Sequence, residues 1–146
     1  MKEFTITRLF DAPRELVFRA WTDPAHLAAW FGPRGTRTPL SSIEVDLRPG
    51  GRWRACMVRE DNGAEFPSGG VYREIVEPER LVFTWALDDR GSESLVTITF
   101  ADHGGKTEMT FHQAGFPDEG ERTGVEEGWV SAFEKLTEHV NDKEQQ

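Results

Sequence analysis

The chain has 146 residues, a length typical of one domain with its own hydrophobic core. Its 17 Lys and Arg residues against 26 Asp and Glu residues give a net charge of −9, which repels phosphate backbones and anionic lipid headgroups, so nucleic acid and membrane surfaces are excluded as expected partners. The lone cysteine, Cys56, excludes an internal disulfide, and neither a signal-peptide stretch nor an apolar run of ~20 residues occurs, so we expect a cytoplasmic protein.

The N-terminal part of the sequence predicts one strand followed by two short helices. Residues 4–10 alternate between polar and apolar side chains with a period of two, which is typical of a strand. Asp11-Ala12-Pro13 then predicts a helix start, because an acidic cap is followed by a proline at a position that needs no backbone N–H. Asp23-Pro24 ends this helix and begins a second one, which ends at Gly32-Pro33.

Residues 43–113 show a pattern of short strands separated by turn signals, so consecutive strands are expected to pair antiparallel. The turn signals are Pro49-Gly50-Gly51, Asp61-Asn62-Gly63, Pro78-Glu79, residues 88–92 and residues 102–105. Within the strand expected at 65–76, the adjacent Gly69-Gly70 predict a bulge or sharp bend that would help the sheet to curl. The polar loop at 34–42 is, by its position, a candidate gate for the mouth of a pocket.

The C-terminal segment predicts a long helix. Thr123 and Glu126 have the spacing of a capping box, in which both side chains bond backbone N–H groups at the helix start. Large apolar residues recur on one face of this helix, namely Val125, Trp129, Phe133, Leu136 and Val140. Because burying each such group contributes ~1.5–3 kcal/mol, we expect this face to pack on the sheet. We expect a single domain over residues 1–146, with its core at 3–140 and a polar tail at 141–146 that frays.

The order of these elements and several short motifs along the chain resemble a known superfamily. The motifs are Asp11-Ala12-Pro13, Val17-Phe18, residues 20–24, residues 30–33, residues 46–51, Gly70-Val71-Tyr72, residues 81–85, His112, Gly115-Phe116 and Gly128-Trp129. Over residues 3–140 the chain is similar to the helix-grip fold of the START-like superfamily, also called SRPBCC, to which the birch pollen allergen belongs. Within it, the chain resembles the branch similar to the C-terminal domain of the activator of heat-shock protein 90 ATPase.

This resemblance implies an α+β helix-grip fold, in which a curved antiparallel sheet of about six or seven strands wraps around a long C-terminal helix and two short helices follow strand 1. It also implies an apolar pocket, because members of the superfamily commonly enclose one. The fold does not define a function, since it hosts lipid carriers, hormone receptors, cyclases and co-chaperones. The co-chaperone of the resembled branch has a separate N-terminal domain, for which this chain has no room, so we do not expect chaperone ATPase activation.

The aromatic residues provide most candidate ligand-binding side chains. The chain has five Trp and ten Phe residues, and those on the expected inward faces either fill the core or line a pocket. Tyr72 and Arg73, two consecutive residues of one strand, are added because one of them could orient a ligand. The ligand-binding candidates are therefore Trp53, Phe66, Tyr72, Arg73, Trp85, Phe111, Trp129 and Phe133. Tyr72 and Arg73 are consecutive in a strand and therefore face opposite sides of the sheet, and the sequence leaves open which of them faces inward.

Signatures of catalysis are sparse in this sequence. Four scattered His residues and one Cys form no metal-ligand pattern, no glycine-rich loop precedes a helix, and no G-x-S-x-G motif occurs, so we expect neither a metal nor a cofactor. The catalytic candidates are His112 and Glu74, which could act as acid and base, with Tyr72 as another partner of the histidine, only if they lie together. The alternative is that His112 is a surface residue, and we favour a protein that is not an enzyme.

Three hypotheses for the function follow, in order of preference. The first is the binding of a small hydrophobic or amphipathic molecule in a cavity between the long helix and the sheet. The second is a protein-interaction or co-chaperone-like module of the stress response, which requires an exposed apolar patch and a chaperone or other protein as its partner. The third is a cyclase-like or hydrolase-like enzyme. The sequence is compatible with a monomer or a homodimer.

Overall fold

The computed structural model describes residues 2–87 and 93–145, with side chains as far as Asn141, so the turn predicted at 88–92 lies outside the described residues. The strands are β1 (Lys2–Phe10), β2 (Thr36–Arg37), β3 (Glu44–Val45), β4 (Arg52–Arg59), β5 (Glu65–Val76), β6 (Arg80–Leu87), β7 (Ser94–His103) and β8 (Lys106–Phe116). The helices are α1 (Arg14–Thr22), α2 (Pro24–Trp30), the short 3-10 helix η1 (Leu40–Ser42) and the long α3 (Glu119–Gln145).

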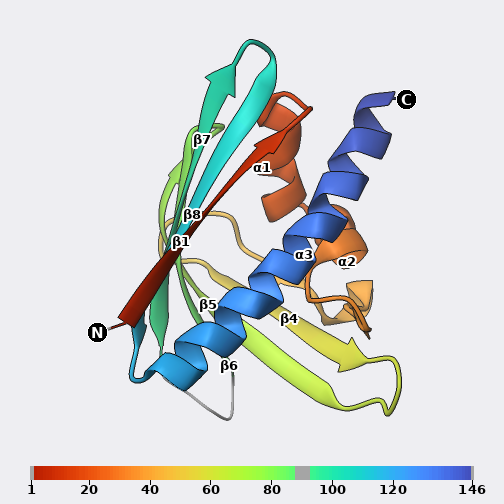
Figure 1. The fold of residues 1–146 in the computed structure, drawn as a ribbon, viewed down its shortest axis with the longest axis vertical. Helices are drawn as coiled ribbons and strands as arrows, with labels where there is room; N and C mark the ends of the chain where they lie inside the picture. Colours follow the sequence, from red (N-terminus) through yellow and green to blue (C-terminus); the bar gives the residue numbers. More distant parts are fainter. Residues whose placement is uncertain (1, 88–92, 146) are drawn as a thin grey trace.

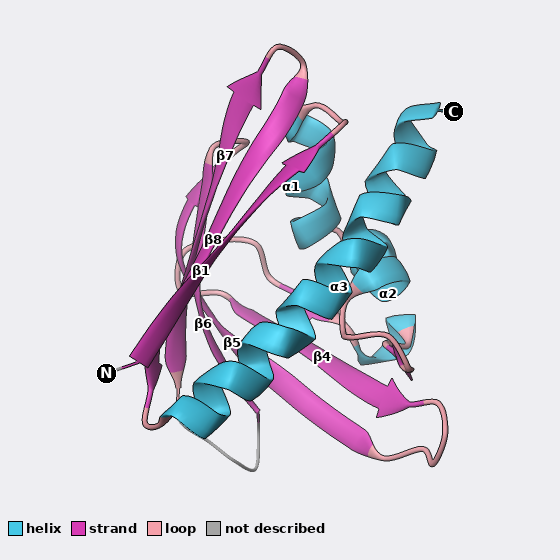
Figure 2. Cartoon of the chain, viewed as in Figure 1, coloured by secondary structure: helices cyan, strands magenta, loops and turns pink. Residues whose placement is uncertain are grey.

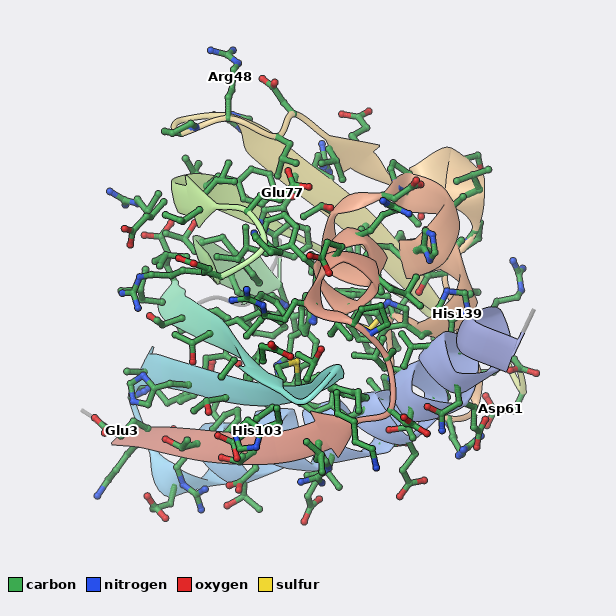
Figure 3. The ribbon with its side chains drawn as sticks, turned by 90° about the horizontal axis from the view of Figure 1, so that it is seen from above. Glu3, Arg48, Asp61, Glu77, His103 and His139 are labelled. Carbon is green, nitrogen blue, oxygen red and sulfur yellow. The ribbon has the colours of Figure 1, made fainter. Side chains whose placement is uncertain are left out.

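The described strands form one antiparallel sheet of eight strands. Their order is β1-β8-β7-β6-β5-β4-β2, and β3 also pairs with β4. Figure 1 shows α3 lying across the hollow side of the curved sheet, and Figure 2 shows α1 and α2 on that same side. Seen from above, Arg48 and Glu3 lie at opposite edges of the molecule (Figure 3). The predicted α+β helix-grip architecture is therefore confirmed, with eight strands where about six or seven were expected.

The N-terminal elements follow the sequence signals closely, except at the first helix cap. In β1 the apolar side chains of Phe4, Ile6 and Phe10 are buried, as the alternating pattern predicts. The N-cap of α1 is Pro13, and no side chain caps this helix, so the expected acidic cap is wrong because Asp11 lies two residues before the capping position. The carboxylate of Asp23 does cap α2, since it accepts a hydrogen bond of 2.9 Å from the backbone N–H of Ala25.

The strands depart from the predicted pattern at two places. The polar loop expected at 34–42 contains the short strand β2, which pairs with the end of β4. The irregularity of β5 lies between Tyr72 and Glu74, whereas Gly69-Gly70 keep the register, so the predicted position of the bulge is wrong. The glycine pair serves close packing instead, because a Cβ atom on Gly70 would lie 1.8 Å from the backbone oxygen of Thr84 on β6.

The long helix begins earlier than its capping-box signal predicts. It starts at Glu119, and the carboxylate of Asp118 accepts a hydrogen bond of 2.8 Å from the backbone N–H of Glu121. Thr123 and Glu126 lie inside the helix, where both contact the guanidinium group of Arg122, so the predicted capping box is wrong. At the other end the helix continues through Gln145, beyond the point at which the polar tail was expected to fray.

The core is a cluster of aromatic rings between α3 and the sheet. Phe133 on α3 is fully buried, and its ring centroid lies 5.3 Å from that of Phe111 on β8 and 6.0 Å from that of Trp21 on α1. Both pairs meet edge to face, a geometry that adds ~0.5–1.5 kcal/mol per pair beyond the burial of the rings. None of the described helices combines the length and the apolar character that a membrane crossing requires.

Candidate functional site

A cavity of about 180 Å³ lies between the N-terminal half of α3 and strands β4 to β6, and we call it the main cavity. It is partly open to solvent, and nearly all of its surface is apolar. Its lining consists of Phe31, Gly32, Pro33, Met57, Phe66, Trp85, Leu87, Gly124, Val125, Gly128, Trp129 and Ala132. Such an apolar hollow with few polar groups is the usual form of a site for a small organic molecule.

The main cavity exists because α3 presents its smallest side chains to the sheet at this level. Gly124, Gly128 and Ala132 follow one another at intervals of four residues, so they lie on the same face of the helix. A Cβ atom on Gly124 or on Gly128 would have no atom within 4 Å. Phe133, which follows Ala132 directly, is fully buried and packs against the aromatic core. The hollow is therefore a consequence of residue size along α3.

One polar group on the lining has no partner. The indole N–H of Trp85 is buried and has no hydrogen-bond partner among the described residues. By contrast, the indole N–H groups of Trp30, Trp53 and Trp129 each donate a hydrogen bond, to the oxygens of Ala20, Thr84 and Gln113 respectively. A buried N–H without a partner costs about 1–3 kcal/mol, so the packing around the Trp85 ring is maintained at a cost to stability.

The segment between α2 and β2 closes one side of the main cavity and is bonded to α3. The Lys135 ammonium group donates a hydrogen bond of 3.0 Å to the backbone oxygen of Gly32, and the backbone N–H of Arg34 donates one of 2.9 Å to the hydroxyl of Ser131. Burial lowers the pKa of Lys135, and the positive charge of Arg34 lowers it further. The guanidinium group of Arg34 also pairs with Glu134 and Glu138, but these groups are exposed and such pairs contribute little to stability.

A second hollow of about 480 Å³ adjoins the main cavity, and we call it the outer hollow; its surface is mostly apolar, but charged residues surround it. The two share Pro33, Met57 and Phe66 in their linings. The remaining residues around the outer hollow include Arg59 and Asp61, which form an ion pair of 2.6 Å. An apolar cavity that continues into a hollow bordered by charged residues can accommodate an amphipathic molecule, with its apolar end inside and its polar end near those charges.

The structure divides the predicted ligand-binding residues into groups. Phe66, Trp85 and Trp129 line the main cavity. Trp53 and Tyr72 line a much smaller space of about 20 Å³ on the inner side of the sheet, which we call the inner hollow. Burial raises the pKa of the Tyr72 hydroxyl, and the negative charge of Asp46 raises it further.

The other predicted site residues lie away from the main cavity. Phe111 and Phe133 are fully buried in the aromatic core. Arg73 is exposed, because the chain irregularity after Tyr72 brings both Arg73 and Glu74 to the solvent side of β5. Of the two consecutive residues in question, Tyr72 is the one that faces inward.

The proposed acid–base groups do not converge. His112 lies on the outward face of β8, where its ring is 3.3 Å from the carboxylate of Glu3, a residue at the edge of the molecule (Figure 3). Glu74 accepts a hydrogen bond of 2.7 Å from Arg80 at the surface, while Tyr72 faces the interior. Within the described residues, no group of three or more His, Cys, Asp or Glu side chains is placed to hold a metal ion. This geometry offers no support for a shared catalytic site of these residues.

Of the twelve residues that line the main cavity, only Phe66, Trp85 and Trp129 were among the predicted site residues. Phe31, Met57 and Leu87 were not among the candidates, although each is apolar and lies in or beside a predicted element. The glycines of α3 were also missed, and their spacing was the available signal, since Gly124 and Gly128 are one turn apart inside a predicted helix where glycine is unfavourable. A glycine in that position has a packing reason more often than a backbone one.

A buried polar chain supports the far wall of the main cavity. The side chain of Gln113 is fully buried, accepts a hydrogen bond of 2.8 Å from the indole N–H of Trp129 and donates one of 2.7 Å to the hydroxyl of Ser94. That hydroxyl in turn donates to the backbone oxygen of Trp85, at 3.2 Å. The chain therefore connects the two tryptophans of the lining and fixes the orientation of the Trp129 ring.

Replacing Gln113 by methionine is expected to lower the free energy of unfolding by about 2–3 kcal/mol. The shape of the side chain is kept, but the indole N–H of Trp129 loses its partner and the hydroxyl of Ser94 loses one of its two hydrogen bonds. Urea denaturation followed by tryptophan fluorescence measures the change. Thr110→Met, on the outward face of the same strand, is the control and should change stability by less than about 0.5 kcal/mol. Equal effects of both variants would contradict the structural role of the polar chain.

Comparisons with known proteins agree on one family and one fold. The family described as Activator of Hsp90 ATPase homolog 1-like protein matches residues 11–141. A crystal structure of a protein from Chromobacterium violaceum is 30% identical over 96% of this chain and 98% of its own, with a TM-score of 0.87. The structure of a protein named AHSA1 from Silicibacter pomeroyi is 27% identical over 97% and 99% of the two chains, also with a TM-score of 0.87. No protein with a curated description matches the chain.

Proposed function

The chain belongs to the family of Activator of Hsp90 ATPase homolog 1-like proteins, and from this premise we propose that it binds a small hydrophobic or amphipathic molecule in the main cavity. The observation that carries the proposal is the partly open apolar space beside the half-buried Gly128 of α3, whose Cβ position meets no other residue within 4 Å. Glycine weakens a helix interior by roughly 1 kcal/mol relative to alanine, so a glycine at this place is costly unless the space has a use.

The dimensions of the main cavity indicate the size of the buried part of the ligand. An apolar cavity of about 150 Å³ in a protein interior holds one benzene molecule. The main cavity has about 180 Å³ and is partly open, so it accepts an apolar group of one or two fused rings. The adjoining outer hollow leaves room for a polar substituent near Arg59. The ligand of this proposal is therefore an aromatic or alicyclic compound with one polar end.

The two other hypotheses receive less support from the geometry. The exposed large apolar side chains of the described residues belong to five separate segments of the chain, namely Leu9, Leu40, Leu47, Val76 and Leu95. A protein-interaction module is better supported by a contiguous apolar patch than by side chains on separate segments. A cyclase-like or hydrolase-like enzyme would need a nucleophile or an acid–base pair in the cavity, whereas the lining is nearly all apolar.

Titration with 2-naphthol, a fused two-ring compound with one hydroxyl group, tests the proposal. We expect a dissociation constant in the micromolar range, roughly 10–100 µM, which is ordinary for an apolar ligand of this size. Binding should quench tryptophan fluorescence, because Trp85 and Trp129 line the main cavity. At ten times the dissociation constant it should also stabilise the fold by about 1.4 kcal/mol in a thermal-shift measurement.

Free tryptophan is the control ligand for this titration, because its zwitterion loses strong hydration on entering an apolar cavity. We expect it to produce neither quenching nor a thermal shift at the same concentration. A complete lack of response to 2-naphthol, in a protein shown to be folded by circular dichroism, would remove the proposed function.

A further inference from the structure

Phe31 separates the main cavity from the inner hollow. It is the residue that the linings of both spaces have in common. Its ring centroid lies 5.6 Å from that of Trp129 in the main cavity and 6.0 Å from that of Trp53 in the inner hollow, with an edge-to-face orientation on both sides. Trp129 belongs to α3 and Trp53 to β4, so the ring of Phe31 lies between helix and sheet.

The backbone around Phe31 is fixed, whereas its ring is held by packing alone. Phe31 is the C-cap of α2, and its backbone oxygen accepts a hydrogen bond of 2.7 Å from the hydroxyl of Thr38. The next residue, Gly32, has a φ of +99°, and a Cβ atom there would lie 2.7 Å from the hydroxyl oxygen of Thr36. The phenyl ring has no polar atom and borders free space on the side of the main cavity. A change of its side-chain rotamer therefore breaks no hydrogen bond.

Each of the two spaces is also lined by one tryptophan whose indole N–H is unpaired among the described residues. Trp85 lines the main cavity and Trp21 lines the inner hollow, and the indole N–H groups of both are buried without a hydrogen-bond partner among the described residues. The inner hollow alone, at about 20 Å³, has room for little more than a water molecule. Joined to the main cavity, it would become the end of a longer apolar site.

We propose that Phe31 is the specificity-determining residue of this site: its ring limits the ligand to the length of the main cavity, and removing it admits a longer, flat apolar molecule that reaches Trp53 and Tyr72. The proposal rests on the proposed function, because it concerns the size of the molecule that the same cavity binds. It predicts that changing Phe31 alters the ratio of the affinities for a long and a short ligand.

Two probes that differ in length test this inference. 2-Naphthol and 1-hydroxypyrene both carry one hydroxyl group and both fluoresce, but the second has four fused rings. We expect the unmodified protein to bind 2-naphthol about tenfold more tightly than 1-hydroxypyrene. In Phe31→Ala, the ratio of the affinity for 1-hydroxypyrene to that for 2-naphthol should rise about tenfold. Both affinities are measured, because Phe31 also lines the main cavity in which 2-naphthol binds. Phe31→Leu should give a smaller gain and retains the fold if the alanine variant does not.

Phe18→Leu is the matched control. Phe18 is also a buried aromatic residue, packs edge to face on Phe100 at 5.6 Å and lines neither space, so its replacement loosens the core without removing the partition. If Phe18→Leu gains affinity for 1-hydroxypyrene as Phe31→Leu does, the partition is not the cause and the inference is wrong. Unchanged selectivity in folded Phe31 variants that still bind 2-naphthol also overturns it and leaves the proposed function intact. Failure of the unmodified protein to bind 2-naphthol removes the proposed function itself.

Discussion

Replacing Gly128 by leucine is expected to abolish the binding of 2-naphthol while the protein remains folded. The Cβ position of Gly128 has no atom within 4 Å and lies on the lining of the main cavity, so a leucine side chain would occupy the space that the ligand needs. The loss of affinity should exceed about tenfold, because a ligand cannot share an apolar cavity of this size with four additional carbon atoms.

The stability of Gly128→Leu should stay within about 1 kcal/mol of the unmodified protein. Leucine is a better helix former than glycine by roughly 0.8 kcal/mol, which offsets part of any strain from overpacking. Fluorescence titration and urea denaturation measure the two effects separately. The matched control is Glu127→Leu, which places the same side chain on the exposed face of α3 and should leave affinity unchanged. Tight binding of 2-naphthol by folded Gly128→Leu would place the ligand outside the main cavity.

Replacing Phe133 by alanine is expected to lower the free energy of unfolding by about 3–5 kcal/mol. The ring of Phe133 is fully buried and lies within 6.3 Å, centroid to centroid, of the rings of Trp21, Trp30, Phe111 and Trp129. Its removal leaves a void that these large rings cannot fill without moving. Because small domains are stable by only about 5–15 kcal/mol, this single change would remove a large part of the stability.

Urea denaturation should show the loss for Phe133→Ala as a lower midpoint with a nearly unchanged slope. Glu127→Ala, on the exposed face of the same helix, should change stability by less than about 0.5 kcal/mol and controls for helix propensity. A loss of less than about 1 kcal/mol in Phe133→Ala would mean that α3 does not pack on the sheet as described.

The fold was accessible from the sequence because the apolar pattern is strong in the elements that build it. Phe4, Ile6 and Phe10 share one face of the first strand. Trp129, Phe133, Leu136 and Val140 lie on one face of a helix, and all of these residues are buried. The errors occur where two local signals compete. Asp118 and Thr123 both offer a capping side chain, and only the three-dimensional position of the chain leaving β8 selects Asp118.

The site was harder to predict from the sequence than the fold. Periodicity shows which face of an element a residue lies on, but not whether the space next to that face is occupied by other side chains. Phe111 and Trp85 both point inward from neighbouring parts of the sheet, yet Phe111 meets the large Phe133 while Trp85 lies at the level of the glycines of α3. The directions in which Tyr72 and Arg73 point depend on a register shift in β5. The glycine pair at 69–70 predicted this shift at the wrong place, because it lies between Tyr72 and Glu74. Such a shift reverses the faces of all later residues in the strand.

The glycines of α3 also have a consequence for protein engineering. A search for a more thermostable version of this chain would select alanine at positions 124 and 128, because each change favours the helical conformation by about 1 kcal/mol and meets no steric obstacle. A methyl group on the half-buried position 128, which lines the main cavity, would narrow it. At position 128, a substitution that raises thermal stability therefore reduces the space available for a ligand.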